Sequence, residues 1–578
     1  MLQIRCKNNN VTKSFPEGTS LLDVYQEFAD EIKLPYPVVS AKVNNVSQGL
    51  KFRLFQNRDV EFMDATEGSG HRAYVRSLTF VLYKATQDVF PGSKLFIEHS
   101  LCRGYYCNFK KKPTPTPSQK EGNIVTNEDV ERIKARMQEI IDLDMPFRRT
   151  ESTTEEAIRI FSERGFADKV KLLETSGQAY TYYYTLGDTI DYYYGPLVPS
   201  ASYLKVWGLE RYEEKPRVGE QSPGIGLLLR VPDWNDPTKL AEKVDQPKTF
   251  EMFAEKTHWD IIMRLSNAGD VNKAIMRGHS SELIQVSEAL QEKKIVQIAE
   301  EIDRRFHQEK NPVRIVLITG PSSSGKTTFC KRLSVQLLAC GLRPVSFSTD
   351  DYFVNRTDTP KLPNGDYDFD NIETVEYSLL EDHLLRLMQG ERVEIPEYNF
   401  VTGKREWNGK KLKLAGDTVL IIEGIHALNP LLTKKIPDSL KYKIYISTLT
   451  SISLDDHNWI PVRDNRLLRR IIRDYNKGAY TAQQTIAQWK NVLAAEDKWI
   501  FPYQETADVM FNSALNIEFA VLRTHAEIIL TSVPKNCPEY AEAHRLLKFL
   551  RYFIPISDKE IPSTSIMREF VGGSSFKY

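Results

Sequence analysis

The sequence contains few cysteines and pairs none of them in the pattern of a metal or redox motif. Its six cysteines are scattered over 578 residues without a CxxC: Cys6, Cys102, Cys107, Cys330, Cys340 and Cys537. This spacing argues against a zinc site and against the disulfide framework of a small secreted protein. The simplest interpretation is a set of reduced thiols in a cytoplasmic protein.

Long hydrophobic runs and an excess of charge of one sign are also missing. No segment is apolar enough to span a bilayer, and the N-terminus, MLQIRCKNNNVTKSF, lacks the apolar run of a signal peptide. Lys+Arg and Asp+Glu both number 77, so the formal net charge is zero and no global field favours nucleic acid or an anionic membrane. We therefore expect neither a secreted nor a membrane-embedded protein.

Apolar and charged residues occur in the proportions of a globular protein, at 41% and 27%. At about 150 residues per domain, the length suggests about four domains. The strand-like runs MLQIRC, VTKSF, VVSAKVNN, RLF and VEFMD, with a helix over Ser20–Ile32, predict a β-grasp domain for residues 1–62.

Residues 63–245 mix helical and strand patterns, which predicts an α+β domain. Helices are expected over Ala73–Val89, Asn127–Leu143 and Thr153–Arg164, and strands through TYYYTLGDTIDYYYG. The Pro/Thr/Lys-rich stretch KKKPTPTPSQKEGN is predicted to be a loop. Residues 246–306 are helical in pattern and are expected to connect this half of the chain to the next.

Residues 307–515 alternate strands with helices, the pattern of a doubly wound α/β domain. RIVLITG has the all-apolar interior of a parallel strand buried on both faces, and PVSFSTDDY, TVLIIEG and KYKIYIS are three further candidate strands. A helix is expected over Thr327–Leu338. Residues 516–578 are expected to form a helical tail that packs on this domain and frays at its end.

A complete GxxxxGK[ST] motif lies between the first of these strands and that helix. Its residues are Gly320, Pro321, Ser322, Ser323, Ser324, Gly325, Lys326, Thr327 and Thr328. In such a P-loop the backbone N–H groups surround phosphate oxygens, the lysine neutralises them and the hydroxyl after it ligates Mg²⁺. The motif therefore predicts a nucleotide-phosphate site at Lys326 and Thr327, with ATP and Mg²⁺ as cofactors.

Carboxylates at two strand ends favour a small-molecule kinase over a GTPase, and the sequence has no NKxD guanine motif. Asp350 and Asp351 follow the strand VSFST, where a carboxylate can accept a hydroxyl proton or hold Mg²⁺. Glu423 ends the strand TVLIIE, where P-loop enzymes hold the water shell of the metal. A helix cap for the aspartates and an ordinary strand-end charge for the glutamate are the alternatives.

Four arginines at i, i+3, i+4 and i+7 share one face of a predicted helix: Arg466, Arg469, Arg470 and Arg473. A lid that closes over a transferring phosphoryl group needs such donors. The alternative is a solvated basic face paired with Asp464 and Asp474.

Residues from Arg314 to about Asn512 resemble the uridine kinase and phosphoribulokinase family, and within it most closely uridine–cytidine kinase. The matching motifs are GPSSSGKTT, STDDYF, YDFD, RVEIPEYNFVTGKR, IIEGIHAL and DNRLLRRIIRD. The resemblance implies transfer of a phosphoryl group from ATP to the 5′-hydroxyl of a nucleoside.

The resemblance also assigns roles to residues of this chain. It implies Asp350 as general base, with Asp351 as second choice, and Asp370 as the residue that holds the ribose hydroxyls. It implies Glu423 as the Mg²⁺-associated acid, Arg470 and Arg473 as lid arginines with Arg470 touching ribose, and Tyr398 and Phe400 as base-stacking aromatics. Gly403 stands where the family has a base-reading histidine, and Lys477-Gly478-Ala479 replaces its RGR element. Base specificity is therefore left open.

The N-terminal half resembles threonyl-tRNA synthetase. Residues 1–62 look like its TGS domain, and FPGSKLFIEHSLCRGYYCNF, NEDVERIKARMQEIIDLDMPFRR and DYYYGPLVPS resemble its editing domain. Aligned on Pro91-Gly92 and Gly195-Pro196, the four His and Cys positions of the editing pocket are Arg76, Phe80, Tyr193 and Leu197. None of these side chains can reproduce that chemistry. Hydrolysis of mischarged tRNA is therefore not expected.

We expect an ATP- and Mg²⁺-dependent nucleoside kinase with a synthetase-like N-terminal half. The alternative is an RNA-binding or regulatory protein whose P-loop acts as a nucleotide switch. For the N-terminal half, RNA binding, sensing of a small ligand and dimerisation are equally open. Tyr180–Tyr184 with Tyr192–Tyr194 either stack bases or pack in a sheet. His71 and His99 are expected to be surface or structural residues. An oligomer is also open.

Overall fold

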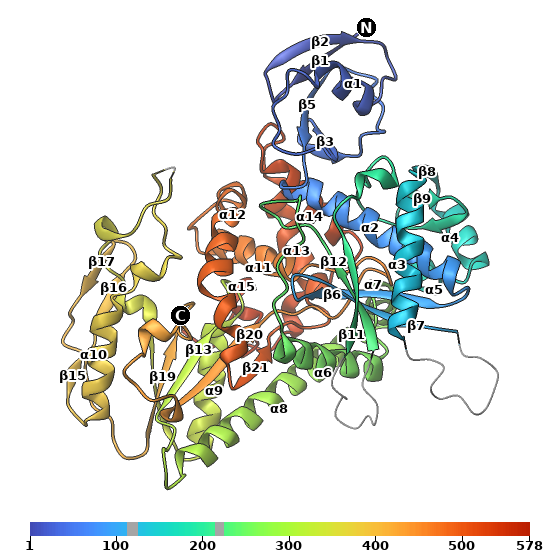
Figure 1. Cartoon of the computed structure of the whole chain (residues 1–578). Coiled ribbons are helices and arrows are strands. Elements are labelled where there is room, and N and C mark those ends of the chain that lie inside the picture. Colours follow the sequence, from blue (N-terminus) through green and yellow to red (C-terminus); the bar gives the residue numbers. More distant parts are fainter. Residues whose placement is uncertain (113–124, 214–224, 364, 578) are drawn as a thin grey trace, which may run out of the picture.

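The computed structural model describes residues 1–112, 125–213, 225–363 and 365–577 (Figure 1). Most of the predicted Pro/Thr/Lys-rich loop lies outside these residues. No helix in the described part of the chain is long and apolar enough to cross a membrane. All six cysteines are described, and each is free.

Residues 1–63 form a five-stranded sheet with one helix, the expected β-grasp arrangement (Figure 1). The elements are β1 (Leu2–Cys6), β2 (Val11–Phe15), α1 (Leu21–Phe28), β3 (Ser40–Val43), β4 (Val46–Gln48) and β5 (Arg58–Met63). Ser20 caps α1 in a capping box with Asp23, as the sequence indicates. The predicted RLF strand is wrong. Leu54 exchanges backbone hydrogen bonds with the turn residues Gly18 and Thr19 instead of a strand.

The next region packs two helices and two sheets around one core. Its elements are α2 (Gly68–Val89), β6 (Lys94–Leu101), β7 (Gly104–Lys110), α3 (Asn127–Asp142), β8 (Phe147–Thr153), α4 (Thr154–Glu163), α5 (Ala167–Thr175), β9 (Tyr180–Leu186), β10 (Thr189–Asp191), β11 (Gly208–Glu213) and β12 (Ile225–Arg230). The strand orders are β10-β9-β8 and β11-β12-β7-β6. Three helices follow: α6 (Pro247–Met263), α7 (Ala268–Met276) and α8 (Ser280–Phe306).

The second half is built on a parallel sheet of order β14-β19-β13-β20-β21. Its main elements are β13 (Ile315–Thr319), α9 (Lys326–Ala339), β14 (Arg343–Ser348), α10 (Tyr377–Met388), β19 (Thr418–Glu423), β20 (Lys441–Ser447), α11 (Val462–Asn476), α12 (Ala482–Trp499) and β21 (Val509–Asn512). Two short hairpin pairs lie beside it: β15 (Val393–Glu394) with β18 (Lys411–Leu412), and β16 (Glu397–Asn399) with β17 (Lys404–Glu406).

Strand β13 explains why this sheet is covered on both faces. Ile315 and Leu317 belong to the core shared with α10, whereas Val316 and Ile318 belong to the core shared with α8 and α9. Because successive side chains of a strand point to opposite faces of the sheet, an all-apolar strand places apolar side chains in both cores. The doubly wound α/β fold is therefore confirmed, and β21 is a fifth strand that the sequence analysis did not predict.

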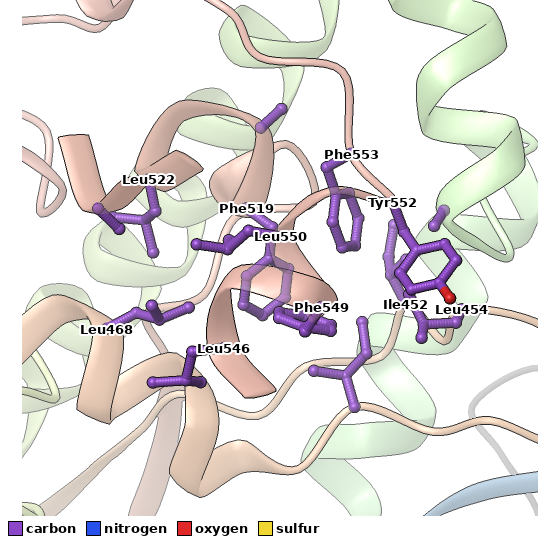
Figure 2. Packing of buried hydrophobic residues seen from close by; sticks show 14 of the residues in the cluster. Ile452, Leu454, Leu468, Phe519, Leu522, Leu546, Phe549, Leu550, Tyr552 and Phe553 are labelled. Carbon is purple, nitrogen blue, oxygen red and sulfur yellow. The ribbon is translucent and has the colours of Figure 1, made fainter. Parts of the chain in front are cut away.

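The C-terminal helices complete a core that both halves of the chain share (Figure 2). They are α13 (Glu518–Thr531), α14 (Tyr540–Leu550) and α15 (Arg568–Val571). Phe519 packs against Phe549 and Phe553 with ring centroids 5.1 and 5.2 Å apart. The same core includes Phe161 of α4 and Leu468 of α11. The tail is packed up to Val571, because Phe570 of α15 is buried in the core beneath α9, whereas residues 572–577 form no helix or strand.

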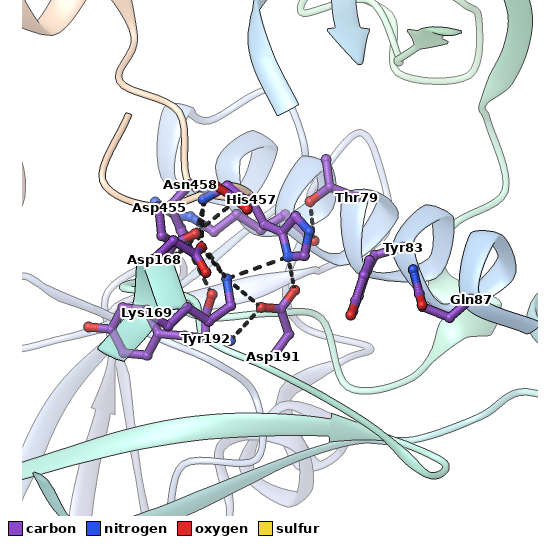
Figure 3. A network of polar contacts seen from close by, with 12 residues as sticks. Thr79, Tyr83, Gln87, Asp168, Lys169, Asp191, Tyr192, Asp455, His457 and Asn458 are labelled. Atoms are coloured by element: carbon purple, nitrogen blue, oxygen red, sulfur yellow. Dashed lines mark hydrogen bonds and ion pairs between the residues drawn. The ribbon is translucent and has the colours of Figure 1, made fainter. Parts of the chain in front are cut away.

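A buried polar network also joins the two halves (Figure 3). Lys169 Nζ lies 3.0 Å from Asp191 and 3.1 Å from Asp455, and His457 Nδ1 lies 2.7 Å from Asp191. Asn458 donates to the Tyr192 carbonyl. Burial alone would lower the pKa of Lys169, but the surrounding carboxylates hold that pKa well above its usual range. The network therefore keeps a charged lysine inside the protein.

Candidate active site

The P-loop wraps from the end of β13 to the start of α9, as its motif predicts. Gly320 is required by close packing, because a Cβ there would lie 2.4 Å from the Ile446 carbonyl oxygen. Gly325 has a φ of +85° and caps α9, a conformation that favours glycine. Lys326 is buried, and its Nζ donates to the Pro321 carbonyl oxygen at 3.3 Å. The glycine-rich turn and the buried lysine are thus brought together at the start of α9.

Three partly buried carboxylates surround Lys326. Burial raises the pKa of Asp350 and of Asp370 to about 6 and that of Glu423 to about 7, and Lys326 opposes each rise. The Thr327 hydroxyl is hydrogen bonded to Glu423. Perturbed carboxyl groups clustered around a phosphate-binding lysine are typical of an active site. The structure therefore brings together the residues that the sequence analysis took from three separate motifs.

The two adjacent aspartates differ in their surroundings. Asp351 completes a capping box with Ser348 at the turn after β14, so part of its role is to cap that turn. Asp350 instead interacts electrostatically with Lys326 and Asp370. Asp350 is therefore the aspartate of this pair that interacts with Lys326.

Close packing of two strand ends positions the acidic residues. A Cβ at Gly424 would lie 1.8 Å from the Thr349 hydroxyl, so only glycine lets the end of β19 approach the turn after β14. Thr319 of β13 donates its hydroxyl to the carbonyls of Gly424 and Ile425 at 2.9 and 2.6 Å. Glu423 and Asp350 are thereby held at the same edge of the sheet.

The four arginines of α11 do not act as one basic face. Arg466 and Arg469 are fully buried and pair with Glu496 and Glu518. Both arginines also hold the P-loop backbone in place, because they donate hydrogen bonds to the Ser322 and Ser323 carbonyls at 3.3 and 3.4 Å.

The other two arginines are more accessible. Arg470 donates to the Ser322 hydroxyl at 2.9 Å and interacts electrostatically with Asp370. Arg473 lies 3.3 Å from Asp474. The expected partner Asp464 pairs with Arg545 instead. The solvated-face alternative is therefore wrong for the two buried arginines. Arg470 and Arg473 both pair with Asp474, as that alternative predicts, and Arg470 also contacts the P-loop.

A small aromatic group borders the site on the side of the β16–β17 hairpin. Tyr398 is buried, Phe400 is 61% exposed, and their ring centroids are 5.1 Å apart. Gly403 has a φ of +68°, and a Cβ there would lie 2.8 Å from Arg356 Nε. The position of the expected base-reading histidine is thus a tight turn covered by Arg356.

The synthetase-like region has no editing chemistry at the aligned positions. Phe80 and Tyr193 are fully buried with ring centroids 5.5 Å apart, and Leu197 belongs to the same core. Arg76 lies against Gly195, where a Cβ would meet Arg76 Nη1 at 2.2 Å. At the positions aligned with the editing pocket, these four side chains are therefore packed in the protein interior.

The remaining aromatic and histidine predictions are resolved by burial. Tyr192, Tyr193 and Tyr194 are buried, so base stacking by this run is wrong, whereas Tyr180 is 64% exposed. His71 stacks on Trp234 and His99 stacks on Phe253. Burial lowers the pKa of both histidines to about 3. Both are structural, and neither lies at the surface.

Two glutamates reach the P-loop from distant segments and were not predicted. Glu496 of α12 accepts from the Ser322 N–H at 3.1 Å. Glu569 of α15 accepts from the Thr328 N–H at 3.2 Å and from its hydroxyl at 2.7 Å. No sequence signal marks either residue, because each acts across more than a hundred positions.

Comparison with known proteins agrees with this geometry. Residues 315–518 match the model of the phosphoribulokinase / uridine kinase family. A uridine kinase of Mycoplasma genitalium is 30% identical over 180 residues, which are 31% of this chain and 75% of that protein. The chain belongs to the phosphoribulokinase / uridine kinase family. Its second half is therefore a P-loop kinase.

The other matches are partial. A threonine–tRNA ligase of Syntrophomonas wolfei is 31% identical over 206 residues, which are 36% of this chain, so the chain spans only 30% of that ligase. The structure of a possible uridine kinase from Bacillus stearothermophilus is 18% identical, with a TM-score of 0.27, and the match covers 38% of this chain and 98% of the other.

Proposed function

We propose that this protein transfers a phosphoryl group from ATP to the 5′-hydroxyl of a nucleoside, with Mg²⁺ as cofactor. The observation that carries the proposal is the cluster of Asp350, Asp370 and Glu423 around Lys326 at the P-loop. A cation for the phosphates, a base for a hydroxyl and an oxygen donor for a metal are the groups that phosphoryl transfer requires. Each is supplied here by a different strand end or helix start.

The available donors suit Mg²⁺. Thr327 and Glu423 offer hydroxyl and carboxylate oxygens, and Mg²⁺ in kinases takes one or two such protein ligands together with phosphates and water. Among the described residues no group of three or more His, Cys, Asp or Glu side chains forms a ready-made metal cage.

In the proposed reaction Lys326 neutralises phosphate oxygens, and Arg470 and Arg473 stabilise charge on the moving group. Asp350 accepts the proton of the attacking hydroxyl, while Asp370 holds the acceptor through its ribose hydroxyls. Tyr398 and Phe400 would flank the base. Catalysis then rests on positioning and charge neutralisation.

The proposal extends to the rest of the chain. We assign residues 1–62 as a TGS-like domain, 63–245 as a synthetase-like domain, 246–306 as a connector, 307–515 as the kinase and 516–578 as a helical tail, in a cytoplasmic protein. The similarity to threonine–tRNA ligase supports RNA as a partner of the N-terminal half. A nucleotide-driven switch on RNA is the second candidate function.

The test is ADP release from ATP and Mg²⁺ against a panel of nucleosides, ribose 5-phosphate, ribulose 5-phosphate and pantothenate. Turnover of one nucleoside that is lost in Asp350→Asn is the expected result. Asp358→Asn is the control, because Asp358 is an exposed aspartate of the same loop. Absence of ADP release with every acceptor, in a protein that still binds ATP, would instead favour the nucleotide-driven switch on RNA.

A further inference from the structure

A segment of the C-terminal tail contacts the P-loop. We define the tail segment as Ser565–Val571, which contains α15. Glu569 of this segment bonds to the N–H and hydroxyl of Thr328, and Ile566 packs on Gly325, where a Cβ would lie only 2.3 Å from Ile566 Cγ2. Two side chains of the tail segment therefore touch the P-loop and the first turn of α9.

The N–H that Glu569 uses is one that a nucleotide needs. The first three N–H groups of α9 have no partner within the helix, since the hydrogen bonds of the helix begin with Phe329 N–H to the Gly325 carbonyl. In a P-loop these groups bind phosphate oxygens. The Glu569 carboxylate is an anion in that place, and its charge also contributes to the raised pKa of Glu423, which burial chiefly causes.

The tail segment is anchored. Phe570 is buried with its ring 4.9 Å from the Arg469 guanidinium, and Asn476 of α11 donates to the Phe570 carbonyl at 3.1 Å. Arg568 pairs with Asp558 at 3.1 Å. Glu569 is thus presented to α9 by a folded element that also touches the helix carrying Arg470 and Arg473.

We propose that the tail segment is an internal competitor of the nucleotide: Glu569 occupies a phosphate position of the P-loop and has to leave it when nucleotide binds. This inference rests on the proposed function, because it takes the P-loop to be a nucleotide site. It assigns the C-terminal residues a regulatory role in the kinase, since whatever holds or releases α15 sets the apparent affinity for nucleotide.

Glu569→Gln in the full-length protein tests the proposal. The amide keeps the shape of the side chain and removes its charge. A hydrogen bond to a charged group contributes about 1.5–3 kcal/mol, so its weakening should make displacement of the side chain easier. The variant should therefore bind ADP with Mg²⁺ about tenfold more tightly than the wild type does, as measured by titration calorimetry. Glu560→Gln removes an exposed carboxylate nine positions earlier in the chain and should leave the affinity unchanged.

Hydrogen exchange provides a second readout that needs no variant. Amides of the tail segment should exchange faster when ADP and Mg²⁺ are bound to the wild type, because Glu569 has been displaced. Equal or weaker ADP binding by a folded Glu569→Gln protein, or a tail segment protected by ADP, would overturn the proposal and leave the kinase assignment standing. Absence of ADP binding in both proteins would overturn the kinase assignment as well.

Discussion

His457 Nδ1 and a carboxylate oxygen of Asp191 lie 2.7 Å apart, although 266 positions separate the two residues. Burial alone would lower the pKa of His457, but the Asp191 carboxylate raises it. Lys169 Nζ contacts the same aspartate and lies 3.5 Å from His457 Nδ1. The contact joins the synthetase-like region to the kinase through charges that water does not reach. Its contribution to the free energy of unfolding can be measured by substituting a residue of the network.

Lys169→Met should destabilise the protein by about 3–5 kcal/mol, because it leaves buried carboxylates without their cation. Urea unfolding followed by circular dichroism measures the change. Lys171→Met is the matched control, since Lys171 is 37% exposed and pairs with Asp270 at the surface. It should cost less than about 1 kcal/mol. Equal effects of the two substitutions would contradict the prediction.

Asp350→Asn should lower turnover by about 10²–10⁴-fold, the usual contribution of a general base. In the wild type, burial raises the pKa of this carboxyl to about 6, so kcat/KM should rise as pH increases through about 6. The rise occurs because only the ionised form accepts a proton. A pH–rate profile for the best acceptor measures both effects. A flat profile in the wild type between pH 5 and 8 would argue against Asp350 as the base.

Glu423→Gln should stabilise the protein at high pH only. Burial raises the pKa of Glu423 from 4.5 to about 7, so the neutral form is favoured in the folded state. The contribution of the neutral Glu423 carboxyl to the free energy of unfolding is complete below pH 4.5 and is lost as pH rises through 7. The substitution should therefore add about 2 kcal/mol at pH 8 and almost nothing at pH 4. Thermal unfolding at the two pH values measures the difference, and equal gains at both would refute it.

Phe400→Ala should raise the KM for the acceptor about tenfold while leaving ADP binding and stability unchanged. Loss of one aromatic stacking partner costs a base about 1–3 kcal/mol, and a ring that is 61% exposed contributes little to the core. Acceptor titrations at saturating ATP measure the change. Val401→Ala, at a residue that is 90% exposed, is the control. An unchanged KM in Phe400→Ala would place the base elsewhere.

The sequence predicts the parts of this fold that depend on local patterns. An all-apolar strand followed by GxxxxGK[ST] specifies β13, the P-loop and α9, and Ser20 with Asp23 specifies the start of α1. Helical spacing also placed four arginines on one face of α11. It could not tell that Arg466 and Arg469 face Glu496 and Glu518, because those partners come from other helices.

Long-range contacts account for the rest. Strand β21 is only four residues long, too short to be recognised from its sequence alone, and it becomes a strand by pairing with β20. Likewise, Glu569 reaches Thr328 only because α15 folds back over α11, and no periodicity in the tail encodes that path.

The shared core has a consequence for how the protein is made. It collects side chains from Ala157 to Val571, so the residues of α4 and α5 need packing partners that are synthesised much later. The first sixty or so residues have a core of their own and can fold during synthesis. The synthetase-like region and the kinase share a core, so neither can complete its folding without the other. Deletion of residues 516–578 would therefore leave the shared core incomplete in both larger parts and would not yield a folded, shortened kinase.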